Sequence, residues 1–380
     1  MRPPGWQTLA LRDRVVSLDW MRRPVRALDR IAGPFPYYGA SGIVDHVNEY
    51  LFDGLHLLVA EDGENLRTRK TPIAFLAAGR FWVNNHAHVM RGNDDNDTRF
   101  LSYVVEMLDI SGYLTGSTQP KLTQHALGGI PVEAPPLFEQ RALAATLGAL
   151  DDKIESNRRT IDVCAGLLDV TSSSLALEVD SVPLSALAAP LRDAFAPSAV
   201  GVELIDHFSI PAFDAKGLPD RTSGTSVISA KLRVDQPSVL VSRLNPATNR
   251  TWFAVPEPGV TAGCSTEFLV LTPTAGVTLG SLWLAVRDEG FRSLLAQRAT
   301  GTSGSHQRVK AQDALATEVP DVRQLPDAEA QAADELLWLM HQRRIESTRL
   351  ATLRDALLPE LLSGRIRVPE ASEAVESALA

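Results

Sequence analysis

The chain has 380 residues, too many for one ordinary domain and enough for two domains that each bury a core. Apolar residues at 44% and charged residues at 22% exclude a disordered or fibrous protein. The net charge is −9, and Cys164 and Cys264 fit neither a metal-like spacing nor a disulfide framework. Because we find no signal peptide and no apolar run of 18 residues, we expect a cytoplasmic protein without a membrane partner.

The first domain is expected at residues 1–134, where short alternating runs predict strands. These runs are YLFDG, HLLVAED and TPIAFLAAGRFWVNN, and residues 97–108 predict a helix. A glycine-rich turn precedes them, and its amide groups and aromatic rings suit phosphate contact or stacking. A tight turn with core tyrosines is an equal alternative. The candidate DNA-binding residues of this turn are Tyr37, Tyr38, Gly39 and Ser41.

A second candidate group follows in the run NNHAHV. Alternation along a strand would place His86 and His88 on one face, as metal ligands require, but no third ligand has a suitable spacing. We therefore favour a groove contact through Asn85 and His86 and predict no metal site. Lys121, in the loop GSTQPKL, adds a basic side chain to the candidate DNA-binding set.

Residues 135–179 contain the first long helix, expected at 137–178 because two prolines precede it and no breaker interrupts it. Apolar residues recur at spacings of three, four and seven, which indicates a heptad seam. This helix would extend about 60 Å. The seam and exposed positions that we expect to form the spacer and to meet partners are Leu147, Leu150, Ile154, Glu155, Arg158 and Ile161.

The second domain is expected at residues 180–325, with strands in VELIDHFSI, SVLVSRL, TWFAV and STEFLVLTP and a helix at 279–297. Its loop GTSGSHQR contains Gln and Arg, the side chains that read adenine and guanine edges. Basic residues near strand ends complete a possible DNA-binding face. The candidates are Lys231, Arg243, Asn245, Ser305, His306, Gln307 and Arg308.

A second long helix is expected within residues 326–366, beginning at Asp327, and an acidic, frayed tail at 367–380. The phrase Ile154-Glu155-Ser156 recurs as Ile345-Glu346-Ser347, so the chain is an internal repeat. Residues 131–180 carry 4 basic and 9 acidic side chains, and residues 326–380 carry 6 and 10, so both helical segments are acidic. Expected spacer residues here are Trp338, Ile345, Glu346, Arg349 and Leu353.

Two apolar stripes on acidic helices must be buried, and the simplest arrangement pairs the helices with each other in antiparallel directions. The predicted fold class is therefore α/β (α+β), with two mixed recognition lobes separated by a two-helix coiled-coil spacer. The sequence has no phosphate-binding loop and no nucleophile elbow. Asn245-Pro246 continues as Ala247-Thr248 and so lacks the aromatic residue of an amino-methyltransferase. We expect a non-catalytic protein.

This organisation resembles that of the specificity subunits of type I restriction-modification systems over nearly the full chain. The segments that carry the resemblance lie in the helices, the loops and both lobes. They are IPVEAPPLFEQ (130–140), LDDKIESNRR (150–159), LRDALLPELLSGRIRV (353–368), GSTQPKL and GTSGSHQRV, PYYGASGIVDHVNEYLFDG and GRFWVNNHAHV in the first lobe, and PAFD, VLVSRLNP and STEFLVL in the second.

The resemblance implies that each lobe reads one half of a bipartite, asymmetric DNA site. It also implies that the helices set the spacer and dock two methyltransferase subunits, which the restriction and translocase subunits then join. No cofactor is expected in this chain, since S-adenosylmethionine would bind to the methyltransferase subunit. The alternatives are a stand-alone DNA-binding regulator, which would usually bind as a symmetric dimer, and a metal hydrolase that uses His86 and His88.

Overall fold

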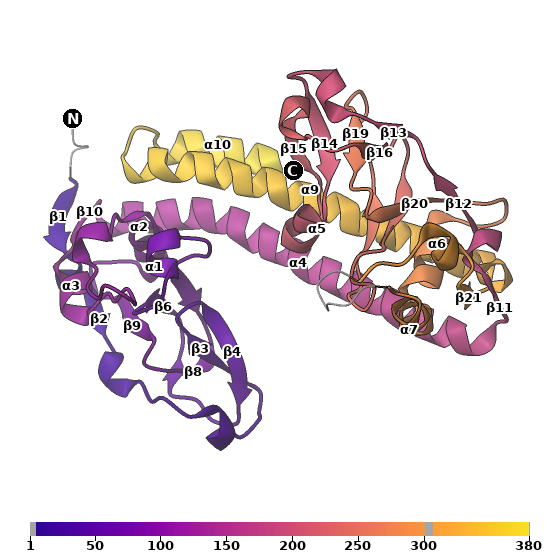
Figure 1. Cartoon of the computed structure of the whole chain (residues 1–380). Helices are drawn as coiled ribbons and strands as arrows, with labels where there is room; N and C mark the ends of the chain where they lie inside the picture. Colours follow the sequence, from indigo (N-terminus) through magenta and orange to yellow (C-terminus); the bar gives the residue numbers. More distant parts are fainter. Residues whose placement is uncertain (1–4, 301–306, 380) are drawn as a thin grey trace. The chain divides into compact units, whose positions relative to one another are not determined.

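The computed structural model describes residues 5–300 and 307–379, and the chain divides into two compact units. The first unit contains residues 1–153 and 350–380, and the second contains 154–349. Each unit holds one lobe and one end of both long helices (Figure 1). Each unit is described by itself below.

Lobe 1 is built on a four-stranded antiparallel sheet, the inner sheet, in the order β2-β9-β6-β7. Helix α2 packs on it, and Asp97 caps α2 by accepting a hydrogen bond from the backbone of Phe100. Strand β6 is buried along its whole length because both faces of this sheet are covered. The bounds are β2 Val15–Ser17, β6 His56–Ala60, β7 Ala74–Ala77, β9 Ala87–Gly92 and α2 Thr98–Met107.

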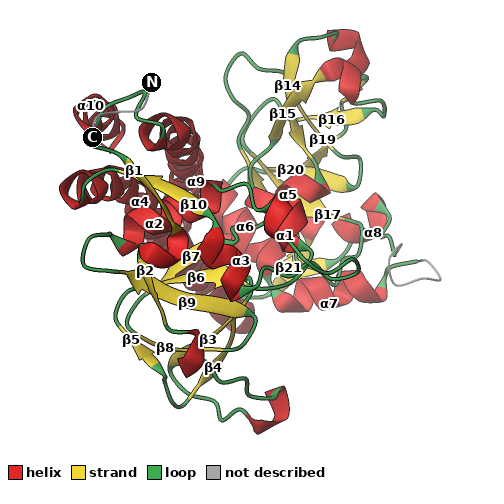
Figure 2. Ribbon diagram, turned by 90° about the vertical axis from the view of Figure 1, so that its left-hand side faces the viewer, coloured by secondary structure: helices red, strands yellow, loops and turns green. Residues whose placement is uncertain are grey.

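A second, outer sheet of lobe 1 has the order β4-β3-β8-β5, with β3 parallel to β8 (Figure 2). Phe52 and Phe81 of this sheet pack with Leu58 and Val89 of the inner sheet in one apolar cluster. The two-stranded ribbon β1-β10 closes the lobe. The bounds are β1 Gln7–Ala10, β3 Phe35–Gly39, β4 Gly42–Val47, β5 Phe52–Asp53, β8 Arg80–Val83, β10 Pro131–Ala134, α1 Asn65–Thr68 and α3 Gln124–Gly129.

Lobe 2 has an inner sheet β12-β20-β17-β18 and an outer sheet β13-β16-β19-β14-β15, with β14 parallel to β19. The helix expected at 279–297 is two helices, α6 and α7, because Asp288 leaves helical geometry and caps α7. The bounds are β11 Ser181–Pro183, β12 Ala188–Leu191, β13 Ala194–Phe195, β14 Leu204–Phe208, α5 Ile210–Lys216, β15 Asp220–Ser223, β16 Lys231–Arg233, β17 Ser238–Ser242, β18 Thr251–Ala254, β19 Ala262–Cys264, β20 Phe268–Pro273, α6 Leu279–Arg287, α7 Glu289–Gln297, α8 Ala311–Leu315 and β21 Glu318–Pro320.

The two lobes have corresponding topologies. The order β2-β9-β6-β7 in lobe 1 matches β12-β20-β17-β18 in lobe 2, and the parallel pair β3-β8 matches β14-β19. The closing ribbon β1-β10 likewise matches β11-β21, where residues 181–183 pair with 318–320. The repeat that the sequence predicts is thus a repeat of the whole lobe.

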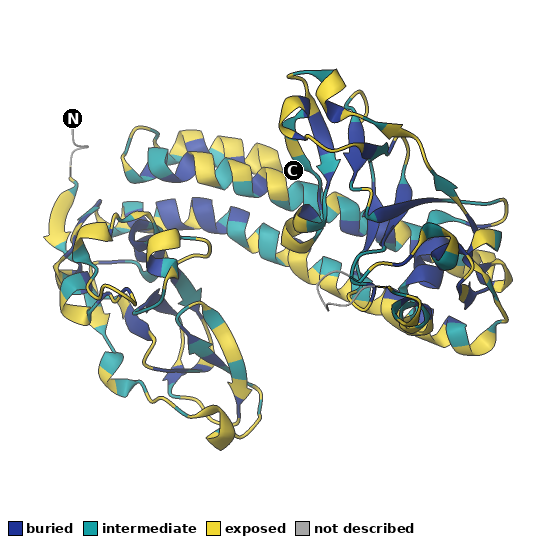
Figure 3. Ribbon diagram, in the orientation of Figure 1, coloured by how far each residue is buried: buried dark blue, intermediate teal, exposed yellow. Residues whose placement is uncertain are grey.

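Helix α4, Leu137–Glu178, has the bounds that the sequence predicts. Helix α9, Asp327–Leu362, begins at the predicted residue and lies within the predicted segment. In the first unit, Asp151 of α4 pairs with Arg354 of α9 at 2.7 Å. In the second unit, later residues of α4 cluster with earlier residues of α9, so the helices run antiparallel. The α4 seam is confirmed, and Figure 3 shows buried positions recurring along the long helix. Ile154 and Ile161 are half-buried. Its buried members are Leu143, Leu147, Leu150, Asn157, Cys164 and Leu168.

The α9 seam differs from the predicted one at Trp338. This side chain remains 36% exposed, and its ring packs edge-on against Phe253 of lobe 2 at a centroid distance of 5.1 Å. Trp338 therefore joins helix to lobe, whereas the predicted Ile345 and Leu353 are half-buried. The fully buried α9 positions are Ala333, Leu337, Met340, Leu350, Leu357, Leu358 and Leu361.

The acidic tail, which we expected to fray, is helix α10, Val368–Leu379. It forms because Ala371 and Val375, spaced four apart, are both buried in the first unit. The Ser372 hydroxyl also lies 3.1 Å from the Thr146 hydroxyl of α4.

Helix α4 corrects one expectation from the sequence. An 18-residue window within it has a mean hydropathy of 1.3, so α4 is long and apolar enough, by composition alone, to cross a membrane. Composition does not separate a membrane span from a helix that buries one stripe against a neighbouring helix. Leu147, Cys164 and Leu168 form such a buried stripe on α4.

Candidate nucleic-acid interface

Two tight turns of lobe 1 lie together at one edge of the outer sheet. Ser41 lies in the β3–β4 turn, and Asn85 and His86 lie in the β8–β9 turn, all exposed. The turns are joined because the Asn84 amide donates to the Tyr38 carbonyl at 3.1 Å. Ser41 is thus brought to the same edge as Asn85 and His86, from which the sequence separates it by more than 40 residues.

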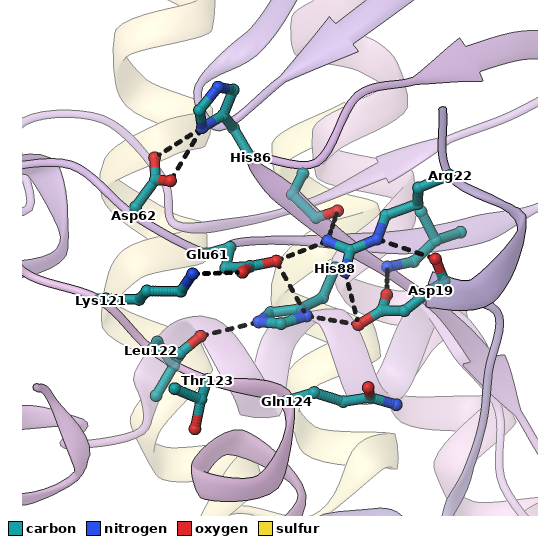
Figure 4. Close-up of polar contacts among 12 residues, drawn as sticks. Asp19, Arg22, Glu61, Asp62, His86, His88, Lys121, Leu122, Thr123 and Gln124 are labelled. Carbon is teal, nitrogen blue, oxygen red and sulfur yellow. Dashed lines mark hydrogen bonds and ion pairs between the residues drawn. The ribbon is translucent and has the colours of Figure 1, made fainter. Parts of the chain in front are cut away.

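The loop that carries Lys121 reaches the same edge. Lys121 forms isolated bridges with Thr115 and Asp62, and its ammonium lies 3.1 Å from the Glu61 carboxylate. The His86 ring lies 2.8 Å from the Asp62 carboxylate (Figure 4). Both candidate DNA contacts are half-exposed, and both are oriented by acidic residues at the end of β6.

A buried polar network that the sequence does not reveal lies beneath this edge (Figure 4). Nδ1 of His88 is 2.6 Å from an Asp19 oxygen, and Nε2 is 2.8 Å from the Leu122 carbonyl oxygen. Arg22 bonds to Glu61 at 2.6 Å. Burial acts to raise the pKa of Glu61, but hydrogen bonds from Arg22 and Lys121 outweigh it and lower that pKa.

This network fixes the loop containing Lys121 against β9, since His88 lies in β9 and bonds to the carbonyl of Leu122, next to Lys121. It also uses both ring nitrogens of His88, which are then not available as metal ligands. No three His, Cys, Asp or Glu side chains within residues 5–300 and 307–379 are placed to hold a metal ion. The geometry therefore gives no support to a metal hydrolase built on His86 and His88.

The aromatic part of the first candidate group is misassigned. Tyr37 is 1% exposed, and its hydroxyl accepts a hydrogen bond from the Val25 amide at 2.9 Å, so its ring is not free to stack on a base. Tyr38 is half-buried against Phe75 and Phe81, and burial raises its pKa. Gly39 is buried as well. The alternative of a tight turn with core tyrosines is correct, and Ser41 alone of this group is exposed.

We call the exposed group Ser41, Asn85, His86 and Lys121 the polar edge of lobe 1. Lobe 2 has an equivalent polar edge. Arg308 bridges to Thr300 and Leu244 and pairs with Glu267 at 2.8 Å. The Asn245 amide donates to the Gln307 carbonyl at 2.8 Å. The structure thus brings together four candidates from the β17 end and the long loop, namely Arg243, Asn245, Gln307 and Arg308. Ser305 and His306 lie outside the described residues.

Lys231 does not belong to this edge. It lies on β16 in the outer sheet, is 6% exposed, and donates to the Ser229 carbonyl and hydroxyl at 2.9 and 2.6 Å. Burial lowers its pKa. Lys231 is therefore a buried structural cation, and the expectation of a strand-end surface charge is wrong for this residue.

The repeated helical phrase presents charges to solvent. Glu155 accepts hydrogen bonds from Arg158 and Arg159, and the Arg158 bond above all lowers the Glu155 pKa to about 2. On α9, Arg343 pairs with Glu346 at 2.7 Å, and Arg349 is exposed. Each of these ion pairs joins residues of the same helix. The helix surfaces are therefore polar, but the pairs do not identify a partner protein.

Comparisons with known proteins agree with this geometry. Residues 3–163 match the family model described as the type I restriction modification DNA specificity domain. A putative type I restriction enzyme specificity subunit of Haemophilus influenzae is 38% identical over 129 residues. That match covers 34% of this chain and 33% of the relative, about a third of its length.

The fold is also that of a solved structure. The crystal structure of a type I restriction-modification system S subunit from M. genitalium superposes with a TM-score of 0.67 at 15% identity. The match covers 94% of this chain and 96% of the other. The family resemblance and the fold class that the sequence predicts are confirmed.

Proposed function

We propose that this chain, a relative of type I restriction-modification specificity subunits, is the DNA sequence-recognition subunit of such a complex. Each lobe reads one half of a bipartite, asymmetric site. The observation that carries the proposal is the matched polar edge, since Lys121 and Arg308 occupy corresponding loops in two lobes of one topology. The side chains around these two residues differ, so the two half-sites differ.

The two long helices support a spacer role. Their buried stripes stabilise an antiparallel pair. The length of each helix is set by a fixed rise of about 1.5 Å per residue. Their acidic outer face suits proteins better than DNA, because like charges repel the phosphate backbone. We assign to this face the docking of two methyltransferase subunits, with restriction and translocase subunits joining afterwards.

In this proposal the methyltransferase subunits carry out methyl transfer. S-adenosylmethionine binds to the methyltransferase subunit, and this chain is non-catalytic and cytoplasmic. The purified chain is expected to show no methyl transfer, whereas the chain with its methyltransferase partner methylates one asymmetric site. Robust methyl transfer by the chain alone would refute the non-catalytic assignment.

The stand-alone regulator remains the alternative, and a footprinting experiment separates it from the proposal. A regulator binds operator DNA without a partner and protects a palindrome, because protein and operator symmetry match. We expect instead that specific protection appears only with the methyltransferase subunit and covers two unlike half-sites. Strong palindromic protection by the chain alone would favour the alternative.

A further inference from the structure

We infer that residues 22–31 of lobe 1, called the strap below, form a DNA-backbone contact at the outer sheet. This inference rests on the proposed function and adds a contact that neither the polar edge nor the helices provide. Arg23 and Arg26 of the strap would bind phosphates, and Leu28 would insert as an apolar wedge in the groove. The DNA-binding candidates predicted from the sequence include none of these three residues.

The strap is held rigidly against the outer sheet. The Trp82 indole donates to the Arg23 carbonyl at 2.6 Å, and the Val25 amide donates to the Tyr37 hydroxyl at 2.9 Å. Arg30 lies over the Tyr37 ring at 4.4 Å and pairs with Asp45 at 3.0 Å. A contact loop fixed in this way loses little conformational entropy when it binds.

The end of the strap is held by a close backbone approach. A Cβ at Gly33 would lie 2.3 Å from the Asn48 Cα, so only glycine fits there. The Asn48 amide also donates to the Ile31 carbonyl at 3.0 Å. The strap is therefore anchored at its beginning, its middle and its end.

The outward side of the strap carries groups without intramolecular roles. Arg23 and Arg26 are exposed and form no ion pair with any residue of the described part of the chain, whereas Arg22 and Arg30 of the same segment are paired. Leu28 is 100% exposed, and Trp20, just before the strap, is 81% exposed. Free guanidinium groups beside exposed apolar side chains are the composition of groove-binding, backbone-contacting proteins.

Lobe 2 shows that the fold does not require this segment. The corresponding connection, between β12 and β14, forms strand β13 and pairs with β16 as part of the outer sheet. The connection in lobe 1 makes no such pairing and is instead held by side chains from other strands. A segment that is anchored but adds no strand, and that exposes cations, is better explained by an external ligand than by folding.

A polyanion is the occupant that the charges favour. Asp29 is the single acidic residue within the strap, against four arginines. Of the acidic residues near the strap, Asp19 lies within the buried network and Asp45 is paired with Arg30. A protein partner that recognised the strap would need acidic residues of its own, whereas duplex DNA supplies regular phosphates. Arginine also reaches phosphates with two parallel hydrogen bonds.

The test uses the complex of this chain with its methyltransferase subunit and a duplex carrying the methylated site. The affinity of the double variant Arg23→Gln/Arg26→Gln is measured by fluorescence anisotropy between about 50 and 200 mM salt. We expect the salt slope of log K to become shallower by about 2, and specific and non-specific DNA to be weakened alike. Leu28→Ser is expected to lower affinity without changing the slope.

Arg12→Gln is the matched control, since Arg12 is an exposed arginine of the same lobe that lies 4.0 Å from Asp13. It should leave the slope unchanged. Failure of the wild-type complex to bind DNA specifically would refute the proposed function itself. If the wild-type complex binds and the double variant matches its slope and affinity, the strap inference alone is wrong. Loss of bound methyltransferase subunit with an unchanged slope would assign the strap to a protein interface and would also overturn the inference.

Discussion

The two lobes share a topology but differ where the connection between the sheets meets the outer sheet. Tyr37 pairs in register with Asp45, and His207 occupies the matching position opposite Asp220. The strap covers Tyr37 in lobe 1, whereas His207 lines a cavity of about 350 Å³ in lobe 2. Nε2 of His207 is buried without a hydrogen-bond partner among the described residues.

This difference indicates that both lobes retain the same strand pairing while the connections between the strands diverge. The inner sheets are buried and ordered alike, so their residues are constrained by packing. The connections and polar edges have no such constraint. The acidic residue that pairs with the basic residue of each polar edge therefore comes from a different segment in each lobe. Glu61 at the end of β6 pairs with Lys121, whereas Glu267 in the β19–β20 turn pairs with Arg308.

The largest expected effect is on the spacer that joins the two lobes. Deleting one heptad within residues 147–168 shortens α4 by about 10 Å while it preserves the seam periodicity. We expect the distance between half-sites to change or binding to be lost, as read from a footprint with the methyltransferase subunit. Arg159→Gln, an exposed change on the same helix, should leave the spacing unchanged. An unchanged spacing after the deletion would contradict the spacer role.

A matched pair of substitutions compares the two polar edges. Lys121→Ala is expected to weaken recognition at the first half-site and Arg308→Ala at the second, each by about 1–3 kcal/mol if it contacts a base. The measurement is binding by the assembled complex to duplexes with single base changes in either half. Equal effects of one substitution on both halves would show that the edges do not act separately.

The polar contacts that join each lobe to helix α4 are expected to contribute differently to the free energy of unfolding. Asp151 of α4 accepts from the Tyr103 hydroxyl at 2.5 Å and from Arg354 at 2.7 Å. Asp151→Ala therefore leaves the Tyr103 hydroxyl without its acceptor, while Arg354 keeps its bond to Asp355. We expect a loss of about 1–3 kcal/mol in the free energy of unfolding. In lobe 2, Asp169 pairs with Arg287 at 2.5 Å but is half-exposed, so Asp169→Ala should cost less than about 1 kcal/mol.

Denaturant unfolding of both variants checks this comparison. Tyr103→Phe removes one donor alone and should cost about 1 kcal/mol. Burial and then the Asp151 carboxylate raise the pKa of Tyr103, so the phenol stays protonated and the effect should not change between pH 6 and about 9. Equal losses of unfolding free energy for Asp151→Ala and Asp169→Ala would contradict the expected difference between the two lobe–helix contacts.

The smallest effect concerns thiol reactivity, which reports on the second unit alone because both cysteines lie there. Burial raises the pKa of Cys264 to about 12 and also raises that of Cys164. Since the thiolate is the reactive form, neither should react at pH 8 while the protein is folded. Mass spectrometry after brief alkylation should find both unmodified, and both modified in denaturant. Rapid labelling of Cys264 in the folded protein would contradict its burial.

The sequence is sufficient to predict the two long helices and the repeat, because these depend on local periodicity. The bounds 137–178 follow from the prolines before the helix and from heptad spacing, and the start at Asp327 follows from its position as a helix cap. The assignments of Tyr37 and Lys231 to the surface are wrong because exposure depends on neighbours distant in sequence. For Tyr37, the decisive neighbour is the strap, whose position no local pattern specifies.

The same reasoning explains what was missed at the polar edge. The buried network of Asp19, Glu61 and His88 depends on three segments that only the folded sheet brings together. The run MRRPVR, with several arginines and one proline, was a usable signal for the strap, but exposure and pairing alone separate Arg23 from Arg22.

The central claim is that the two lobes read unlike half-sites independently, and exchange of one lobe tests it most directly. Residues 181–318 are replaced by the second lobe of a related subunit, and methylation is mapped at single-molecule resolution in cells that also carry the methyltransferase subunit. We predict that one half-site changes while the other half and the spacer length are retained. A change in both half-sites, or an unchanged site, would contradict the account.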